Sequence, residues 1–158
     1  YTFKAWLHQF RYEVPEAMEL AYKIIQMSSE FGHAFWQTCG QLIHAWGVAH
    51  SSSLEQGIDL FEVALKKARK TGTLGKTYQN AQLAELYFQA GDMENAHRAL
   101  TRAEKRAESS GDGFWKSELL RQRGVMLATE KQTHFEGLNL IMAAIDRAKD
   151  ASAHRSEE

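Results

Sequence analysis

Residues 83–103 read LAELYFQAGDMENAHRALTRA, and this stretch shows most clearly the pattern that decides the fold. Its small residue Ala96 has counterparts at Ala17, Gly57 and Gly137, so the four positions follow one another at intervals of 40, 39 and 41 residues. Further apolar residues stand four and seven positions after each of them: Ala21 with Ile24, Phe61 with Ala64, Leu100 with Ala103, and Ile141 with Ala144. This spacing places each trio on one face of a helix. The sequence therefore predicts a stacked helical array in which one face recurs four times.

Residues typical of helix ends repeat at the same interval. Four positions before each small residue stand Glu13, Ser53, Asp92 and Thr133, and three of these four are good N-caps. Glycines that typically end helices recur at Gly32, Gly72 and Gly111. Because caps and stops follow the same period as the apolar face, the repeating unit is predicted to be helix, turn, helix, turn.

These signals divide the chain into eight expected helices. We place them at about 1–12, 15–31, 33–50, 53–70, 74–91, 92–108, 114–130 and 133–150. They form one domain over residues 1–150, with units at about 1–32, 33–72, 73–112 and 113–150. The turn cluster from Ser109 to Gly113 separates the last two units. The tail 151–158 lacks large apolar residues and is expected to be frayed or disordered.

Composition excludes several classes of protein. With 44% apolar residues the chain can bury a sizeable core, and 19 basic against 20 acidic residues provide no overall attraction to nucleic acid or to an anionic membrane. No stretch approaches the roughly 20 apolar residues of a membrane span. A single cysteine, Cys39, excludes an internal disulfide framework. We expect a cytoplasmic protein, and the start at Tyr1 suggests a fragment of a longer one.

The third unit carries a family resemblance. Leu83, Ala84 and Tyr87, followed by Ala96, Leu100 and Ala103, fall on the spacing of the tetratricopeptide repeat. All four units resemble this repeat, although they have about 40 residues instead of 34 and lack the terminal proline. The resemblance implies an all-α fold, a right-handed α-α superhelix of about four helix pairs.

A narrower resemblance concerns three phrases, at 54–58, 84–91 and 115–121. They are similar to the carboxy-terminal repeat regions of large bacterial signalling ATPases that are joined to adenylate or guanylate cyclase domains or to LuxR-type DNA-binding domains. That resemblance implies a sensor and interaction region. No P-loop, cyclase segment or helix-turn-helix reader is found in this chain.

The tetratricopeptide architecture implies that the first helix of each pair lines a concave groove. Carried over by register, the partner-binding residues are Trp46, His50, Tyr78, Glu85, Phe88, Gln89, Glu118 and Arg121. Trp46 and Phe88 are the expected apolar anchors, while Glu85 and Arg121 read polar groups. The alternative is that these side chains only fill the interior of the curve.

Catalytic and metal-binding chemistry is not predicted. No two of the seven histidines stand four residues apart, as two ligands on one helical face would. Cys39 lacks a recognisable base and is expected to be a small buried residue. The basic run from Lys66 to Lys70 ends a predicted helix, where cations stabilise the helix dipole, so we interpret it as a solvated face.

The expected function is therefore that of a non-enzymatic scaffold without a cofactor. It would bind a protein or peptide in the groove, or a neighbouring domain of the same chain, and would not bind nucleic acid or membrane directly. Two alternatives stay open. One is a small-molecule or signal-peptide receptor, and the other is an oligomerisation spacer that forms a homodimer through apolar end faces, for which Trp6 and Phe10 are candidates.

Overall fold

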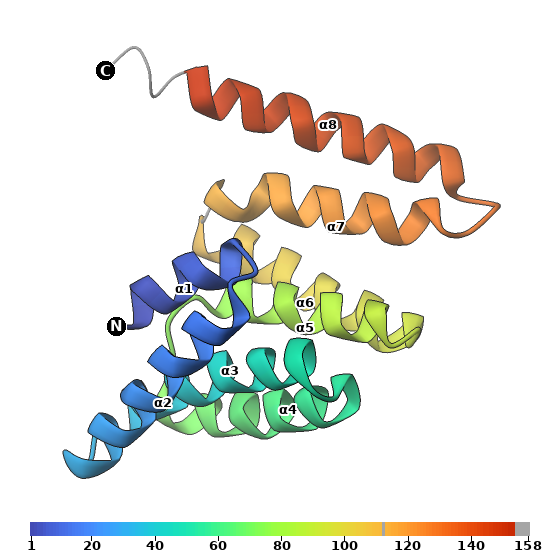
Figure 1. Cartoon of the computed structure of the whole chain (residues 1–158). Helices are drawn as coiled ribbons and strands as arrows, with labels where there is room; N and C mark the ends of the chain where they lie inside the picture. Colours follow the sequence, from blue (N-terminus) through green and yellow to red (C-terminus); the bar gives the residue numbers. More distant parts are fainter. Residues whose placement is uncertain (112, 154–158) are drawn as a thin grey trace. The chain divides into compact units, whose positions relative to one another are not determined.

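The computed structural model describes residues 1–111 and 113–153, and within these residues the chain is helical and contains no strand (Figure 1). The predicted all-α class and the predicted number of α-helices are confirmed for this part of the chain. The helices are α1 Thr2–Phe10, α2 Val14–Glu30, α3 Ala34–Ser51, α4 Leu54–Thr71, α5 Lys76–Gln89, α6 Met93–Ser110, the short 3-10 helix η1 Gly113–Trp115, α7 Lys116–Ala128 and α8 His134–Ala153.

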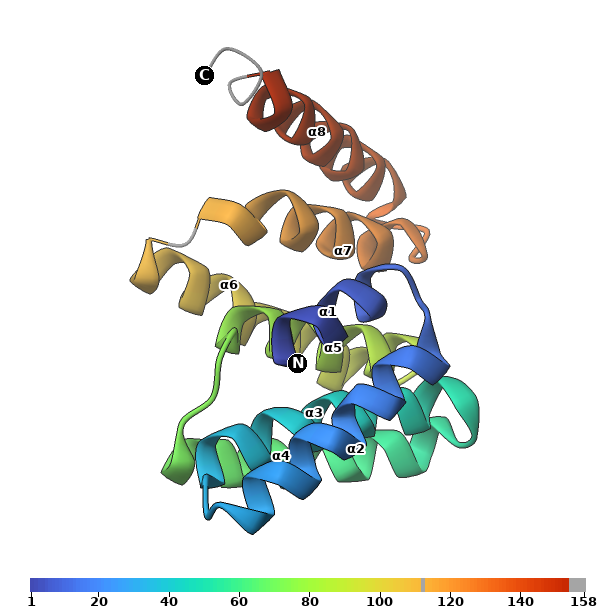
Figure 2. The same ribbon diagram turned by 60° about the vertical axis from the view of Figure 1, so that its left-hand side comes forward.

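The chain forms two compact units, residues 1–75 and 76–158. The first contains α1 to α4 and the second contains α5 to α8, so each unit holds two of the predicted helix pairs. Inside each unit every α-helix packs against the next one along the chain (Figures 1 and 2). Whether residues 1–150 form a single array depends on how the two units are joined. That array stays a prediction.

Two of the predicted N-caps are observed directly. The backbone N–H of Gln56 donates to the Ser53 hydroxyl at 3.2 Å, and that of Asn95 donates to the Asp92 carboxylate at 3.0 Å. These bonds satisfy backbone donors that have no partner inside the helix. The backbone N–H of Asn95 and its side chain both donate to Asp92, and these bonds lower the pKa of that carboxyl.

The other two positions behave differently. Glu13 makes no side-chain cap, and its carboxylate lies 2.5 Å from Nδ1 of His8 instead. The hydroxyl of Thr133 donates to the carbonyl of Leu127 at 2.9 Å, and this bond links the end of α7 to the start of α8. Position in the repeat therefore predicts where a helix begins better than how its first turn is satisfied.

Several boundaries differ from the predictions by two or three residues. α5 begins at Lys76, and α7 is preceded by the 3-10 turn η1, so neither helix starts as early as expected. α8 continues to Ala153, past the predicted end at residue 150, so residues 151–153 are helical. The rest of the predicted tail, 154–158, and Asp112 of the turn cluster lie outside the described residues.

The repeated face forms the core of both units. Of its twelve members, Ile141 is partly exposed and all the others are buried: Ala17, Ala21, Ile24, Gly57, Phe61, Ala64, Ala96, Leu100, Ala103, Gly137 and Ala144. Burial of each larger member contributes roughly 1.5–3 kcal/mol to folding. The predicted helical face is thus confirmed as the face that packs.

Small residues mark the places where two helix backbones touch. A methyl group added to Gly57 of α4 would lie 2.4 Å from Cβ of Ala49 and 2.5 Å from its backbone nitrogen, in α3. In the second unit, a methyl group on Gly137 of α8 would lie 2.5 Å from the carbonyl oxygen of Gly124 in α7. Contacts this short leave no room for a side chain, which explains the small residue at the head of each repeat.

Polar contacts also hold α7 against α6. The guanidinium of Arg123 donates to both carboxylate oxygens of Glu104, at 3.1 and 2.6 Å, and to the hydroxyl of Thr101 at 3.1 Å. Nη1 of Arg123 lies 2.9 Å from Nδ1 of His97. The Arg123 and Glu104 side chains are only 19% and 31% exposed, so this pair is screened less than a surface ion pair.

Candidate partner-binding surface

A hollow of about 140 Å³ opens between α5 and α7, the first helices of the two pairs in the second unit. Its walls combine apolar and polar side chains: Glu85, Phe88, Gln89, Arg121, Gln122, Val125 and Met126. Four of these seven belong to the predicted groove. The spacing of α5 residues 85, 88 and 89 and of α7 residues 121, 122 and 125 places each set on one face of its helix.

Arg121 is held in a fixed orientation by Glu118. Nε and Nη2 of Arg121 donate to the two carboxylate oxygens of Glu118 at 2.8 and 2.7 Å, which is a bidentate arrangement within one turn of α7. The amide nitrogen of Gln122 also donates to Glu118, at 2.9 Å. Glu118 does not line the hollow, but it orients two side chains that do.

Gln122 offers an acceptor that the described residues leave unused. The residue is 6% exposed, and its Oε1 has no hydrogen-bond partner there. Because its amide nitrogen is already engaged by Glu118, the side chain cannot turn to exchange the two ends without losing that bond. An unpaired acceptor of this kind costs about 1–3 kcal/mol. A donor that reached this oxygen would recover that cost.

Tyr78 lies in the same unit but serves a packing role. Its ring stacks on Trp115 with the centroids 4.8 Å apart and the planes inclined by 17°. Its hydroxyl accepts a hydrogen bond from the amide of Gln82 at 2.7 Å, and the residue is 8% exposed. Tyr78 therefore joins η1 to α5 and does not line the hollow.

Trp46 and His50 belong to the first unit, where they form an aromatic cluster with Tyr12. The Trp46 and His50 rings lie 4.5 Å apart, and the Tyr12 ring lies 6.0 Å from Trp46 and 5.7 Å from His50. Trp46 is 3% exposed, so its ring has little surface left for a partner. Partner contact at Trp46 and His50 stays a prediction.

The backbone at Tyr12 shows how firmly this cluster is built. Tyr12 has φ 55°, a left-handed conformation that glycine adopts after α5, where Gly91 has φ 77°. A bulky residue in this region is strained. The tyrosine ring that covers Trp46 explains why a side chain stands at this turn in place of glycine.

An apolar hollow of about 280 Å³ lies elsewhere in the first unit. It is lined by Tyr1, Thr2, Phe3, Ile24, Met27, Ser28, Phe31, His33 and Trp36. Tyr1, Phe3 and Phe31 are each more than 60% exposed, so this is the open aromatic surface of the unit. None of its lining residues is an aspartate, glutamate, lysine or arginine.

Metal-ligand groups and membrane-spanning helices are not found among the described residues. These residues contain no group of three or more histidine, cysteine or acidic side chains that could hold a metal ion. Cys39 is buried, and its Sγ lies 3.5 Å from the hydroxyl of Thr73. In residues 1–111 and 113–153, no helix combines the length and the apolar character that crossing a bilayer requires.

Sequence reasoning missed Gln122, Val125 and Met126. The signal was present, since Gln122 stands four residues after Glu118 and Val125 four residues after Arg121, on the same side of one helix. The prediction transferred individual groove positions from the tetratricopeptide architecture. It did not include the residues beside them on the same helical face. Only the packing of α5 against α7 shows that these side chains close the hollow.

Comparison with known proteins returned no match. No family model matches the chain, and neither a curated protein nor a solved structure does. The likeness to tetratricopeptide repeats therefore depends on the recurrent helical face and on its spacing of about 40 residues.

Proposed function

We propose that this chain is a non-catalytic scaffold of the tetratricopeptide type that binds a protein or peptide partner on the surface formed by α5 and α7. In this proposal the helix pairs stack as a right-handed α-α superhelix. The chain would act in the cytoplasm, as the interaction region of a larger bacterial signal-transduction or transcription-regulating protein. It would work by shape and hydrogen bonding, without a cofactor.

The unpaired acceptor of Gln122 is the observation that carries this proposal. A buried acceptor beside an oriented Arg121 and the half-buried ring of Phe88 combines one apolar contact with two polar ones. An extended or helical peptide supplies both kinds of group, because its side chains are apolar or charged and its amides donate hydrogen bonds.

The size of the hollow favours a peptide side chain over a small-molecule ligand. A volume of about 140 Å³ is well below the roughly 300–1,000 Å³ of pockets that enclose drug-sized molecules. It suits a single side chain that enters from a longer segment lying across α5 and α7. The receptor alternative therefore has less support at this site than partner binding.

Selection from a randomised peptide display library against the whole immobilised chain tests the proposal. The affinity of the best selected peptide is then measured by titration calorimetry for the wild type and two variants. We expect Arg121→Ala and Gln122→Met each to weaken binding at least tenfold, which corresponds to about 1.4 kcal/mol. Melting temperatures of both variants establish that they remain folded.

The chain contains a matched control. Arg98 pairs with Glu94 within one turn of α6, as Arg121 pairs with Glu118 in α7, and it does not line the hollow. Arg98→Ala should leave the affinity unchanged. Selected peptides that bind Arg121→Ala and Gln122→Met as tightly as the wild type would refute the assignment of this surface.

A further inference from the structure

An apolar stripe runs along the exposed side of α8. It consists of Phe135, Leu138, Met142 and Ile145, which are 81%, 41%, 64% and 49% exposed. The spacing of three, four and three residues places them on one side of the helix. α8 lies beside α7 in Figures 1 and 2, and it packs on α7 through Gly137 and its neighbours. Large side chains in such a row, at this exposure, are typical of an interface.

The internal repeat relates three residues of the α8 stripe to three residues of α2. Leu138, Met142 and Ile145 are the first, fifth and eighth residues after Gly137, and the corresponding residues after Ala17 are Met18, Tyr22 and Ile25. All three of these α2 side chains contact α3, the helix that follows.

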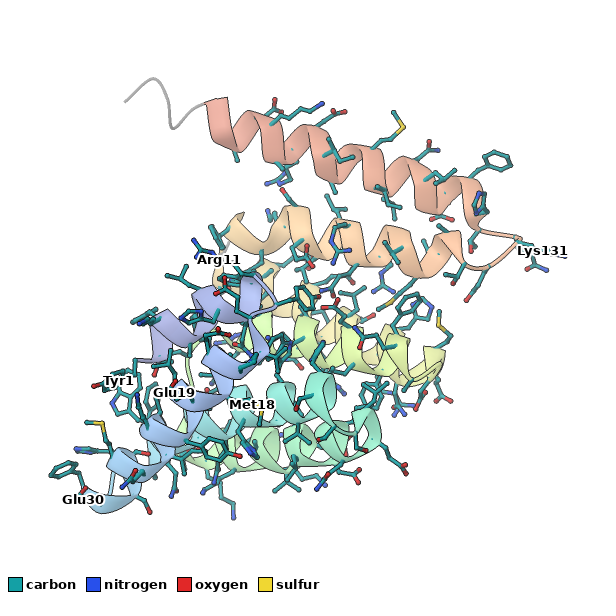
Figure 3. The ribbon with its side chains drawn as sticks, viewed as in Figure 1. Tyr1, Arg11, Met18, Glu19, Glu30 and Lys131 are labelled. Carbon is teal, nitrogen blue, oxygen red and sulfur yellow. The ribbon has the colours of Figure 1, made fainter. Side chains whose placement is uncertain are left out.

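The contacts between α2 and α3 are specific. Met18, labelled on α2 in Figure 3, packs over Gly47 of α3. A methyl group added to Gly47 would lie 2.3 Å from Cγ of Met18, and one added to Gly40 would lie 2.9 Å from Cγ1 of Ile25. The hydroxyl of Tyr22 lies 3.2 Å from Nε2 of His44. Residue numbers rise along α2 while they fall along α3, so the two helices pair antiparallel.

In the second unit, polar residues of α6 occupy the corresponding positions and also contact the helix that follows. The corresponding residues of α6 are His97, Thr101 and Glu104, and all three contact Arg123 of α7. Two independent helices thus use the positions 1, 5 and 8 to receive the next helix. In α8 the same three positions carry apolar side chains that the described part of the second unit leaves exposed.

We propose that α8 of a second copy of this chain occupies the stripe, so that two chains pair through antiparallel α8 helices. The intervals of three, four and three residues between the stripe residues are the same in both directions along α8. A two-fold axis between Leu138 and Met142 therefore sets Leu138 against the second copy's Met142, and Phe135 against its Ile145. This is the antiparallel arrangement by which α3 packs on α2, and it makes the contact isologous.

Charge also favours a second copy of α8 over a charged partner. Residues 137–145 contain no charged side chain, so two copies meet at the axis without bringing like charges together. A charged partner would find no side chain of opposite charge in this stretch of α8. This inference does not depend on the proposed binding surface between α5 and α7, because none of the stripe residues lines that hollow.

The stripe is short, and the dimer should be weak. At 1.5 Å per residue it extends roughly 15 Å, so it buries less surface than a standard interface, and we expect a dissociation constant of roughly 10–100 µM. Sedimentation equilibrium of the whole chain over about 1–500 µM measures it. The average mass should rise from 18.0 kDa toward twice that value, and added salt should not dissociate the dimer.

Met142→Glu tests the surface, and Val63→Glu is its matched control. Both residues are 64% exposed apolar side chains on a helix, so neither substitution opens a core, but Val63 lies on α4. We expect Met142→Glu to weaken dimerisation at least tenfold and Val63→Glu to leave it unchanged. Equal effects of the two variants, or no effect of Met142→Glu, would overturn the proposal, as would a mass of 18.0 kDa at every concentration.

Disulfide trapping tests the direction of pairing. In a Cys39→Ala background, Leu138→Cys and Met142→Cys chains are oxidised separately and as a mixture. Antiparallel pairing predicts rapid cross-linking of the mixture and slow cross-linking of either chain alone. Preferential self-linking of both variants would show a parallel pair and contradict the two-fold arrangement.

Discussion

Replacing Gly57 with alanine tests whether the repeated small residue exists because two helix backbones touch. The new methyl group would lie 2.4 Å from Cβ of Ala49 and 2.5 Å from both its Cα and its backbone nitrogen. Two of these three atoms belong to the backbone of α3. No side-chain rotation can relieve the contact, so α3 and α4 would have to move apart.

Two opposing effects decide the magnitude. Alanine is favoured over glycine inside a helix by about 1 kcal/mol. Overfilling a close-packed contact costs about 1–3 kcal/mol, and the rigid backbone at Ala49 places Gly57→Ala at or above the upper end of that range. We expect the free energy of unfolding to fall by about 2 kcal/mol or more, which lowers the melting temperature by at least about 4–8 °C.

Urea unfolding followed by far-UV circular dichroism measures this change, with Gly47→Ala as the control. Gly47 is also helical, but the atoms nearest to its added methyl group belong to the flexible side chain of Met18, at 2.3 and 2.9 Å. Because methionine can change rotamer, Gly47→Ala should stay within about 1 kcal/mol of the wild type. A Gly57→Ala chain at least as stable as the wild type, or an equal loss in Gly47→Ala, would refute the reasoning.

Three further predictions concern polar groups. Arg123→Met should lower the free energy of unfolding by about 1–3 kcal/mol in urea titrations, because it leaves the partly buried carboxylate of Glu104 without its partner, and Arg123→Lys should not restore the bidentate contact. Burial lowers the pKa of His44, so between that value and the ordinary value of about 6.5 the unfolded chain binds more protons than the folded one. Stability should therefore fall as the pH drops through 6.5, and His44→Gln should show a smaller fall in urea titrations at several pH values. Gln9 is 2% exposed with neither side-chain polar atom paired, so Gln9→Met should raise the free energy of unfolding by about 1–2 kcal/mol, whereas a loss of stability would show that the amide has a partner.

The helices could be predicted because their signals are local and periodic. Ala17, Gly57, Ala96 and Gly137 mark the buried face in all four pairs, since the 3.6-residue period of a helix is visible in any stretch of two turns. The observed helix boundaries differ from the predicted ones where the local sequence signal is weak. α7 begins only after the 3-10 turn at Gly113–Trp115, and α5 begins only at Lys76.

The candidate site was predicted only in part. Glu85, Phe88, Gln89 and Arg121 do line one hollow, because they lie on the faces of α5 and α7 that meet. Trp46, His50 and Tyr78 occupy corresponding repeat positions but are engaged by neighbouring rings. Equivalent positions in a repeat share a direction on the helix, whereas the neighbour that each side chain meets differs from unit to unit.

The amino-acid sequence by itself determined the helical class, the period of about 40 residues and the face that the second helix of each pair buries, because these depend on local and periodic spacing. Only the tertiary structure decided which side chains remain available to contact a partner. The unpaired Gln122 acceptor, the strained turn at Tyr12 and the exposed stripe on α8 arise from contacts between helices. Such contacts depend on the distance and rotation of two packed surfaces, which no single helical period contains.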